Sequence, residues 1–262
     1  MIRTALFDIR SAFRSYHIVT TLAWQDIATR YKRSRIGAFW LTVGMAVTIG
    51  ALGFVFGNLF NQPMNEFLPY LTVGMILWNF LSMVLTEGGN SFVIATDIIL
   101  QVKIPLFLHV MRVLWRNIII LGHNIIILPF VFLFFLKPVS FTILLAIPGF
   151  FLMVMNVSWM MLILSVVCAR FRDFPQIVQN FLQIMYFMTP ILWNATQLPG
   201  RVPKSFLDFN PFYHILCIVR SPIMGEIPSG LNWNYSLVMM VIGWSLAILI
   251  FGRYRTKIPY WL

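Results

Sequence analysis

Long runs of apolar residues alternate with short polar segments along the whole chain. Six of these runs reach the length of about 17 to 25 residues that a helix needs to cross the hydrocarbon core of a bilayer. They lie at residues 37–60, 69–88, 108–136, 141–169, 177–193 and 233–252. The pattern therefore predicts an all-α, polytopic membrane protein with six transmembrane helices.

The segment before the first span keeps an amphipathic pattern. In residues 12–30, Phe13, Ile18, Leu22 and Ile27 recur at near-helical spacing among charged and polar side chains. A helix with one apolar and one charged face lies in the plane of the membrane surface. We therefore predict an N-terminal amphipathic interface helix.

The loop after the second predicted span, residues 91–107, is too polar to lie in lipid but keeps several aliphatic residues. Pro105 ends any helix in this loop, because proline lacks the N–H donor and clashes with the preceding turn. We expect a short surface helix that stops before Pro105.

Residues 194–232 are too polar, and too interrupted by proline, to cross the membrane as one helix. The apolar part, residues 206–224, predicts short external re-entrant helices before the last span. One transmembrane domain, residues 1–262, then accounts for the whole chain. Its expected parts are a cytoplasmic interface segment (1–35), spans one to five (37–193), the external re-entrant region (194–232), span six (233–252) and a cytoplasmic tail (253–262).

Lysine and arginine are distributed unevenly between the two sides of the predicted spans. Fifteen lie on the side that carries both termini, and four lie on the other side. Cytoplasmic loops of membrane proteins are enriched in these residues, so both termini should be cytoplasmic. Orientation and contact with anionic membrane lipid explain the net charge of +11, and no nucleic acid is expected as a partner.

Composition leaves little room for catalytic chemistry. The chain is 60% hydrophobic and 10% charged, and no glycine is followed by lysine, so the phosphate-binding loop of an ATPase is missing. The four histidines are scattered, and Cys168 and Cys217 lack metal-site or redox spacing. We expect no catalytic residue, no metal site and no cofactor bound by this chain.

Aromatic residues make up 16% of the chain, and several lie on the second and fifth predicted spans. Tyr70, Trp78, Tyr186 and Phe187 are candidates to line a channel in which aromatic faces stack against sugar rings. The alternative is the aromatic belt that membrane proteins place at both interfaces.

Two other classes of membrane protein are less well supported. A secondary transporter usually needs buried carboxylates as ion relays, and only Glu87 lies in or at the end of a predicted span. A membrane enzyme that handles lipid-linked sugars needs a carboxylate or histidine constellation, and the chain has no Asp-x-Asp sequence.

Three motifs resemble those of a known family. Residues 30–40 (RYKRSRIGAFW) resemble the signature that opens the first span in ABC-2-type permeases exporting cell-surface polysaccharides. Residues 169–173 (ARFRD) and 189–193 (TPILW) are similar to the arginine-rich turn and the Pro-Ile element that flank the family's fifth span. Residues 210–212 (NPF) look like its Asn-Pro motif in the external re-entrant region.

The resemblance implies a homodimer in the bacterial inner membrane that binds two copies of a cytoplasmic ABC ATPase. ATP and Mg²⁺ would be bound by that partner. The short helix after the second span, at about residues 95–105, would be the coupling helix that docks on the ATPase. The coupling residues would be Asp97, Ile98, Leu100, Gln101 and Lys103.

The resemblance also implies that the substrate is a lipid-linked polysaccharide, with O-antigen the nearest likeness and capsule polysaccharide or teichoic acid as alternatives. The basic residues Arg30, Lys32, Arg33 and Arg35 lie at the expected cytoplasmic headgroup level, where they would attract the pyrophosphate of the lipid carrier. Ordinary positive-inside anchoring explains the same four residues.

Overall fold

A computed structural model describes residues 2–32, 37, 39–194 and 204–262. The described residues form helices and connecting turns, with no strand among them. The helices are α1 (Ile2–Arg14), α2 (Tyr16–Tyr31), α3 (Phe39–Leu59), α4 (Met64–Gly89), α5 (Ser91–Ile94), α6 (Thr96–Gln101), α7 (Leu106–Ile125), α8 (Ile127–Phe134), the 3₁₀ helix η1 (Phe141–Leu145), α9 (Ala146–Arg170), α10 (Phe174–Met188), α11 (Lys204–Asp208), α12 (Pro211–Ile223), α13 (Gly230–Tyr254) and α14 (Ile258–Trp261).

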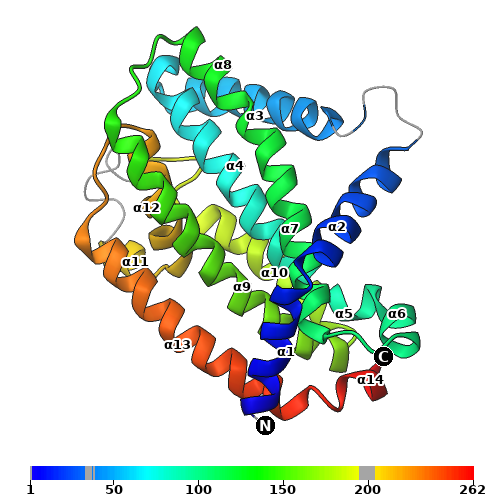
Figure 1. Cartoon of the computed structure of the whole chain (residues 1–262). Helices are drawn as coiled ribbons and strands as arrows, with labels where there is room; N and C mark the ends of the chain where they lie inside the picture. The colour runs from blue at the N-terminus through cyan, green and yellow to red at the C-terminus, as the bar shows by residue number, and fades with distance from the viewer. Residues whose placement is uncertain (1, 33–36, 38, 195–203) are drawn as a thin grey trace.

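Five segments of the described residues are long and apolar enough to cross a membrane: Phe39–Leu59, Met64–Gly89, Leu106–Phe134, Phe141–Arg170 and Gly230–Tyr254. They correspond to predicted spans one, two, three, four and six. The all-helical, multi-pass architecture is therefore confirmed. The N- and C-terminal helices α1 and α14 lie near α5 and α6 at one end of the bundle (Figure 1).

The predicted fifth span, residues 177–193, differs from the structure. Its helix, α10, is Phe174–Met188, and the chain turns over the last five predicted residues. Pro190 explains the early end, because a residue before proline is disfavoured in the helical region. Thr189 accordingly has an extended backbone, with φ −92° and ψ 135°.

The amphipathic segment begins earlier than predicted and consists of two helices that meet at Ser15. The buried face of α1 is made by Ala5, Asp8 and Ala12, and it packs on α7 and α13. Small residues on this face let α1 lie close to both spans. The strongly amphipathic helix is thus α1, which precedes most of the predicted segment, whereas α2 shows little separation of apolar and polar faces.

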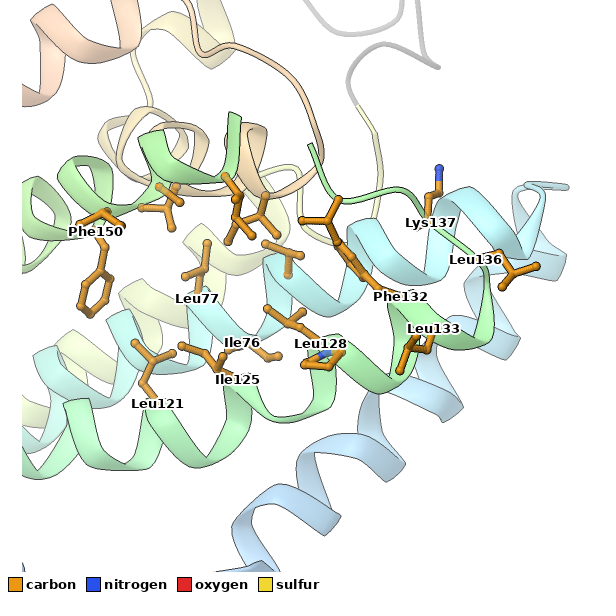
Figure 2. A pocket seen from close by; sticks show the side chains of 18 residues that line it. Ile76, Leu77, Leu121, Ile125, Leu128, Phe132, Leu133, Leu136, Lys137 and Phe150 are labelled. Atoms are coloured by element: carbon orange, nitrogen blue, oxygen red, sulfur yellow. The ribbon is translucent and has the colours of Figure 1, made fainter. Parts of the chain in front are cut away.

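The third span is broken between α7 and α8. Pro129 cannot donate a hydrogen bond to the carbonyl of Ile125, four residues earlier, so the continuous helical ladder is interrupted there. Beside the break, α8 and η1 leave an apolar cavity of about 880 Å³ bounded by α4, α7, α9 and α12 (Figure 2).

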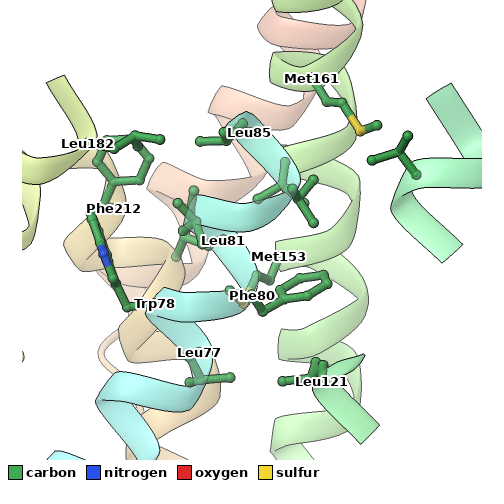
Figure 3. Packing of buried hydrophobic residues seen from close by; sticks show 14 of the residues in the cluster. Leu77, Trp78, Phe80, Leu81, Leu85, Leu121, Met153, Met161, Leu182 and Phe212 are labelled. Atoms are coloured by element: carbon green, nitrogen blue, oxygen red, sulfur yellow. The ribbon is translucent and has the colours of Figure 1, made fainter. Parts of the chain in front are cut away.

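The core is centred on α4, in which every residue from Leu71 to Trp78 is buried. Leu77, Trp78, Phe80, Leu81 and Leu85 of α4 pack against side chains from neighbouring helices (Figure 3). These partners include Leu121 of α7, Met153 and Met161 of α9, Leu182 of α10 and Phe212 of α12. The second span, α4, is therefore the helix that the rest of the bundle surrounds.

The region predicted to hold short re-entrant helices, residues 206–224, contains the end of α11 and the whole of α12. Unlike a surface helix, α12 is buried against α4, α9 and α13. At Gly149 of α9, an added Cβ would lie 2.3 Å from the carbonyl oxygen of Ile218, so glycine is needed for α12 to approach this closely.

Candidate functional site

The short helix α6 presents most of its surface to solvent. It contains no buried residue, and the side chains of Asp97, Leu100 and Gln101 are exposed, as is Lys103 just after the helix. Ile98 is half-buried. The structure thus places four of the five predicted coupling residues on α6 and the fifth, Lys103, two residues after its end.

Two features hold α6 in place. The preceding α5 packs between α7 and α9, and the C-terminal helix α14 packs on α6 itself. After α6 the chain is extended at Val102, and Pro105 precedes the first turn of α7. A force applied to α6 is therefore carried directly to the ends of α4 and α7, since only α5 and a four-residue linker separate them from it.

Asp8 fixes the start of α7 from the other side. Its buried carboxylate accepts hydrogen bonds from the backbone N–H groups of Leu106, at 3.3 Å, and Phe107, at 2.9 Å. These N–H groups are unsatisfied within the helix, and the helix N-terminus favours a negative charge. The same carboxylate pairs with Arg255 at the end of α13.

Of the four basic residues predicted to attract a lipid pyrophosphate, the structure describes two. Arg30 lies at the end of α2 and its guanidinium is 3.5 Å from the Glu87 carboxylate, while the Lys32 side chain is exposed. Arg33 and Arg35 lie outside the described residues. Arg30 is therefore already paired with a carboxylate on α4.

Sequence reasoning missed the ion-pair network to which Arg30 belongs. Arg116 of α7 bridges two carboxylates, Asp26 at 3.1 Å and Glu87 at 2.7 Å. Arg112, one turn earlier, also binds Asp26, through its Nε at 2.9 Å. The i,i+4 pairs Asp26/Arg30 and Arg112/Arg116 were the signal available, because residues four apart share a helix face.

The four predicted channel residues do not lie in one place. Trp78 and Tyr186 pack together, with ring centroids 5.8 Å apart, and both line a cavity of about 490 Å³ between α3, α4, α7 and α10. Asn79, Ser82 and Asn124 add polar groups to its wall. This cavity carries both aromatic and hydrogen-bonding side chains, which is the chemistry that sugars require.

Tyr70 and Phe187 lie elsewhere. The Tyr70 hydroxyl donates to the carbonyl oxygens of Pro190, at 2.9 Å, or Trp193, at 3.3 Å, and its ring lies 4.4 Å from the Arg220 guanidinium carbon. Phe187 is 60% exposed on α10. Tyr70 therefore holds the turn after α10 instead of joining Trp78 and Tyr186.

The TPILW segment after α10 and the NPF segment at the start of α12 are joined by hydrogen bonds. The Asn210 side-chain oxygen caps α12 by accepting from the N–H groups of Phe212 and Tyr213, and its amide donates to Thr189 Oγ1 at 3.1 Å. Arg220 of α12 donates to the Pro190 carbonyl at 2.5 Å. The NPF and TPILW sequences thus form one hydrogen-bonded junction between α10 and α12.

Among the described residues, no group of three His, Cys, Asp or Glu side chains is arranged to hold a metal ion. Cys168 and Cys217 are both buried and both free. The site features are thus an exposed helix, a charged network and a mixed aromatic and polar cavity in a multi-pass membrane protein.

The sequence profile of the ABC-2 type transporter family matches residues 18–224 of the chain, which include α6, the network around Arg116 and the cavity lined by Trp78 and Tyr186. The chain belongs to the ABC-2 type transporter family. The family predicted from the three motifs, and the class of ABC transporter permease, are confirmed. Members of this family are transport subunits and are generally not enzymes.

The matches to three curated relatives cover between 79% and 95% of the chain. The O-antigen export system permease protein RfbA of Klebsiella pneumoniae is 22% identical over 250 residues, which is 92% of this chain and 93% of the relative. RfbA of Myxococcus xanthus is 20% identical over 213 residues, covering 79% and 80%. The polysialic acid transport protein KpsM of Escherichia coli is 23% identical over 259 residues, covering 95% and 96%.

Proposed function

We propose that this chain is the membrane-spanning subunit of an ATP-driven exporter that moves a lipid-linked cell-surface polysaccharide across the bacterial inner membrane. O-antigen is the first candidate substrate. The observation that carries this proposal is α6, an exposed helix between two spans with no buried residue. Together with the family profile, it supports docking of a separate ATPase. Relatives named for O-antigen export support the substrate class.

The proposed topology has six crossings. Asp8 near the N-terminus contacts Arg255 near the C-terminus, so both ends of the chain lie at one end of the bundle. Five crossings would leave the termini on opposite sides, so this contact supports an even number of crossings. The missing crossing is supplied by α10 with the turn that follows it.

The contacts of α10 support this assignment. Arg172, just before α10, donates to the backbone of the C-terminal Leu262, and Thr189, just after it, binds Asn210. The helix rises about 22 Å over its 15 residues, and the following turn adds the remaining depth. With the basic residues at the terminal end, both termini are cytoplasmic.

In the proposed complex, two copies of this chain form a homodimer and each binds one cytoplasmic ABC ATPase, which holds ATP and Mg²⁺. Asp97, Ile98, Leu100, Gln101 and Lys103 contact the ATPase. Closure of the ATPase pair moves α6, and the rigid connections to α4 and α7 carry that movement into the spans. No cofactor is bound by this chain itself.

The substrate path has two proposed parts. Lys32, with Arg33 and Arg35, attracts the lipid-linked pyrophosphate at the cytoplasmic surface, and Arg30 contributes if its contact with Glu87 opens. The polymer then passes the wall formed by Trp78 and Tyr186. Reversing the charges of Arg33 and Arg35 should lower export while the protein still inserts, and unchanged export would reject their role in binding substrate.

Capsule polysaccharide is the second candidate substrate. The supporting observation is the match to KpsM, which covers 95% of this chain at 23% identity. The exported glycan is identified by deleting the gene and analysing which surface polysaccharide disappears.

Docking through α6 is tested with the double variant Asp97→Arg/Leu100→Asp. Both side chains are exposed, with Leu100 at 58%, so the variant should fold and insert normally. We expect it to lose copurification with the ATPase and to lose ATP-dependent export. Arg10→Glu, an exposed charge reversal on α1, is the control, and equal export by the double variant and the control would reject the docking site.

A further inference from the structure

The apolar cavity beside the broken third span is larger than the cavity at Trp78. It measures about 880 Å³ and is walled by Ile76 and Leu77 of α4, Leu128 and Phe132 of α8, and Phe150 of α9, among other apolar side chains (Figure 2). The cavity is open on one side, and its apolar wall suits an apolar occupant that enters from the surrounding bilayer.

Lys137 is the one charged residue among those that line this cavity. It follows α8, and its backbone N–H donates to the Phe132 carbonyl at 2.9 Å, which fixes it at the rim. Its amine points away from the apolar side chains (Figure 2) and has no hydrogen-bond or ion-pair partner in the described part of the chain. Lys137 also borders a polar pocket lined by Glu66, Arg220 and Glu226, so this unpaired cation stands between that pocket and the mouth of the apolar cavity.

We propose that this cavity binds one acyl chain of an anionic phospholipid, whose phosphate pairs with Lys137. The occupant must be apolar to match the wall and elongated to follow the gap from Leu121 of α7 to Leu136. It must also be anionic at one end to complement the lysine. A phospholipid has these properties, and basic side chains at the ends of spans extend to the headgroup level.

The position of the cavity favours a phospholipid of the surrounding bilayer. Most of its lining belongs to three candidate spans, Met64–Gly89, Leu106–Phe134 and Phe141–Arg170, and its mouth lies at the end of α8. On the proposed topology this mouth faces the extracytoplasmic leaflet, whereas binding of the lipid does not depend on that topology. Its volume lies within the ~300–1,000 Å³ typical of small-molecule sites.

A bound acyl chain would support the packing of α12. Val219 and Ile223 of this helix face the same cavity from the side opposite α8. The acyl chain would therefore fill the space behind the helix that carries Arg220, which donates to the Pro190 carbonyl. Lipid composition would then affect how firmly the junction of α10 and α12 is held.

Native mass spectrometry of the delipidated protein, titrated with phosphatidylglycerol or phosphatidylcholine, tests the site. We expect one phosphatidylglycerol per chain to be retained in preference to phosphatidylcholine. Lys137→Glu should weaken that retention about 30-fold, and Lys137→Gln about fivefold, because each basic charge near a headgroup adds a few-fold in affinity. Lys257→Glu, an exposed reversal near the C-terminus, should leave it unchanged.

A second variant tests binding of the acyl chain independently of charge. Ala146 lines the cavity, so Ala146→Phe should fill it and abolish retention of both lipids. Ala51→Phe adds the same ring at an exposed position of α3 and should leave retention intact. Unchanged lipid binding in both Lys137→Glu and Ala146→Phe would overturn the proposal.

Two other results would also overturn it. Preference for a long-chain polyprenyl phosphate over phosphatidylglycerol would identify the cavity as a site for the lipid carrier. Dissociation of the oligomer by Ala146→Phe, with lipid retention unchanged, would identify it as a contact between copies of this chain. Neither result would affect the ATPase docking through α6, which is measured by copurification.

Discussion

The carboxylate of Asp8, in the first helix, lies 2.7 Å from the guanidinium of Arg255, at the end of the last span. The Asp8 side chain has no solvent exposure, and that of Arg255 is 31% exposed. The same carboxylate accepts the N–H of Phe107 at the start of α7. One side chain therefore joins the N-terminal helix, the third span and the last span.

Asp8→Ala should destabilise the protein by about 3 kcal/mol, at the lower end of the range for breaking a buried ion pair because Arg255 is partly hydrated. The N–H groups of Leu106 and Phe107 would also lose their acceptor. Denaturant unfolding in detergent micelles measures the loss. Asp173→Ala is the control, since Asp173 is exposed and its side chain makes no capping hydrogen bond, and a similar loss in both variants would contradict the role of Asp8.

The network around Arg116 predicts non-additive mutations. Arg116 contacts both Asp26 and Glu87, so removing either carboxylate changes what the other one binds. In a double-mutant cycle of Asp26→Asn and Glu87→Gln, the coupling energy should lie between about 0.5 and 3 kcal/mol, as for residues of one hydrogen-bonded network.

The matched cycle pairs Glu87→Gln with Asp8→Asn. These two carboxylates share no hydrogen-bond or ion-pair partner in the described part of the chain. Their effects on the free energy of unfolding should add within about 0.5 kcal/mol. Strict additivity in the first cycle would mean that Arg116 does not bridge α2 and α4.

The aromatic cavity predicts a change in export. Tyr186 is partly buried and lines the cavity, so Tyr186→Ala should lower export without loss of assembly. Trp78 is only 7% exposed and packs on Phe212, so Trp78→Ala would create a core cavity as well, and Trp78→Phe is the cleaner test. Export is measured as surface polysaccharide per inserted protein.

Phe130→Ala serves as the control for these variants. Phe130 is 69% exposed on α8 and lies away from the aromatic cavity, so its removal should leave export near the unmodified level. Normal export in both Tyr186→Ala and Trp78→Phe would count against a substrate path along this wall.

Much of the fold was predictable because the signals were local. An apolar run of about 20 residues has few options other than spanning a bilayer, and five predicted spans match apolar helices. The short helix before Pro105 followed from composition and from the chemistry of proline. The end of α10 at Met188 was missed because high hydropathy across Thr189–Trp193 outweighed the effect of Pro190.

The candidate sites were less predictable because they depend on contacts between distant residues. Tyr70 and Trp78 lie two turns apart on α4, yet Tyr70 binds the turn at Pro190 while Trp78 packs on Tyr186. Sequence spacing places both on one helix and cannot specify which neighbour each one meets. The same is true of Glu87, which stood out as a rare carboxylate but whose partner, Arg116, is supplied by another helix.

The close approach of α9 and α12 gives the sharpest stability prediction. A Cβ at Gly149 would lie 2.3 Å from the Ile218 carbonyl oxygen, and backbone of a buried helix cannot move away as a flexible side chain can. Gly149→Ala should therefore displace α12, lower the free energy of unfolding by about 1–3 kcal/mol, and weaken the bond between Arg220 and Pro190. Gly122→Ala is the matched control, because a Cβ at Gly122 of α7 would meet nothing within 4 Å. This control should leave stability unchanged or raise it by up to about 1 kcal/mol, since alanine favours the helix. If both variants unfold at the same denaturant concentration, α12 is not packed on α9 at Gly149 in the membrane protein.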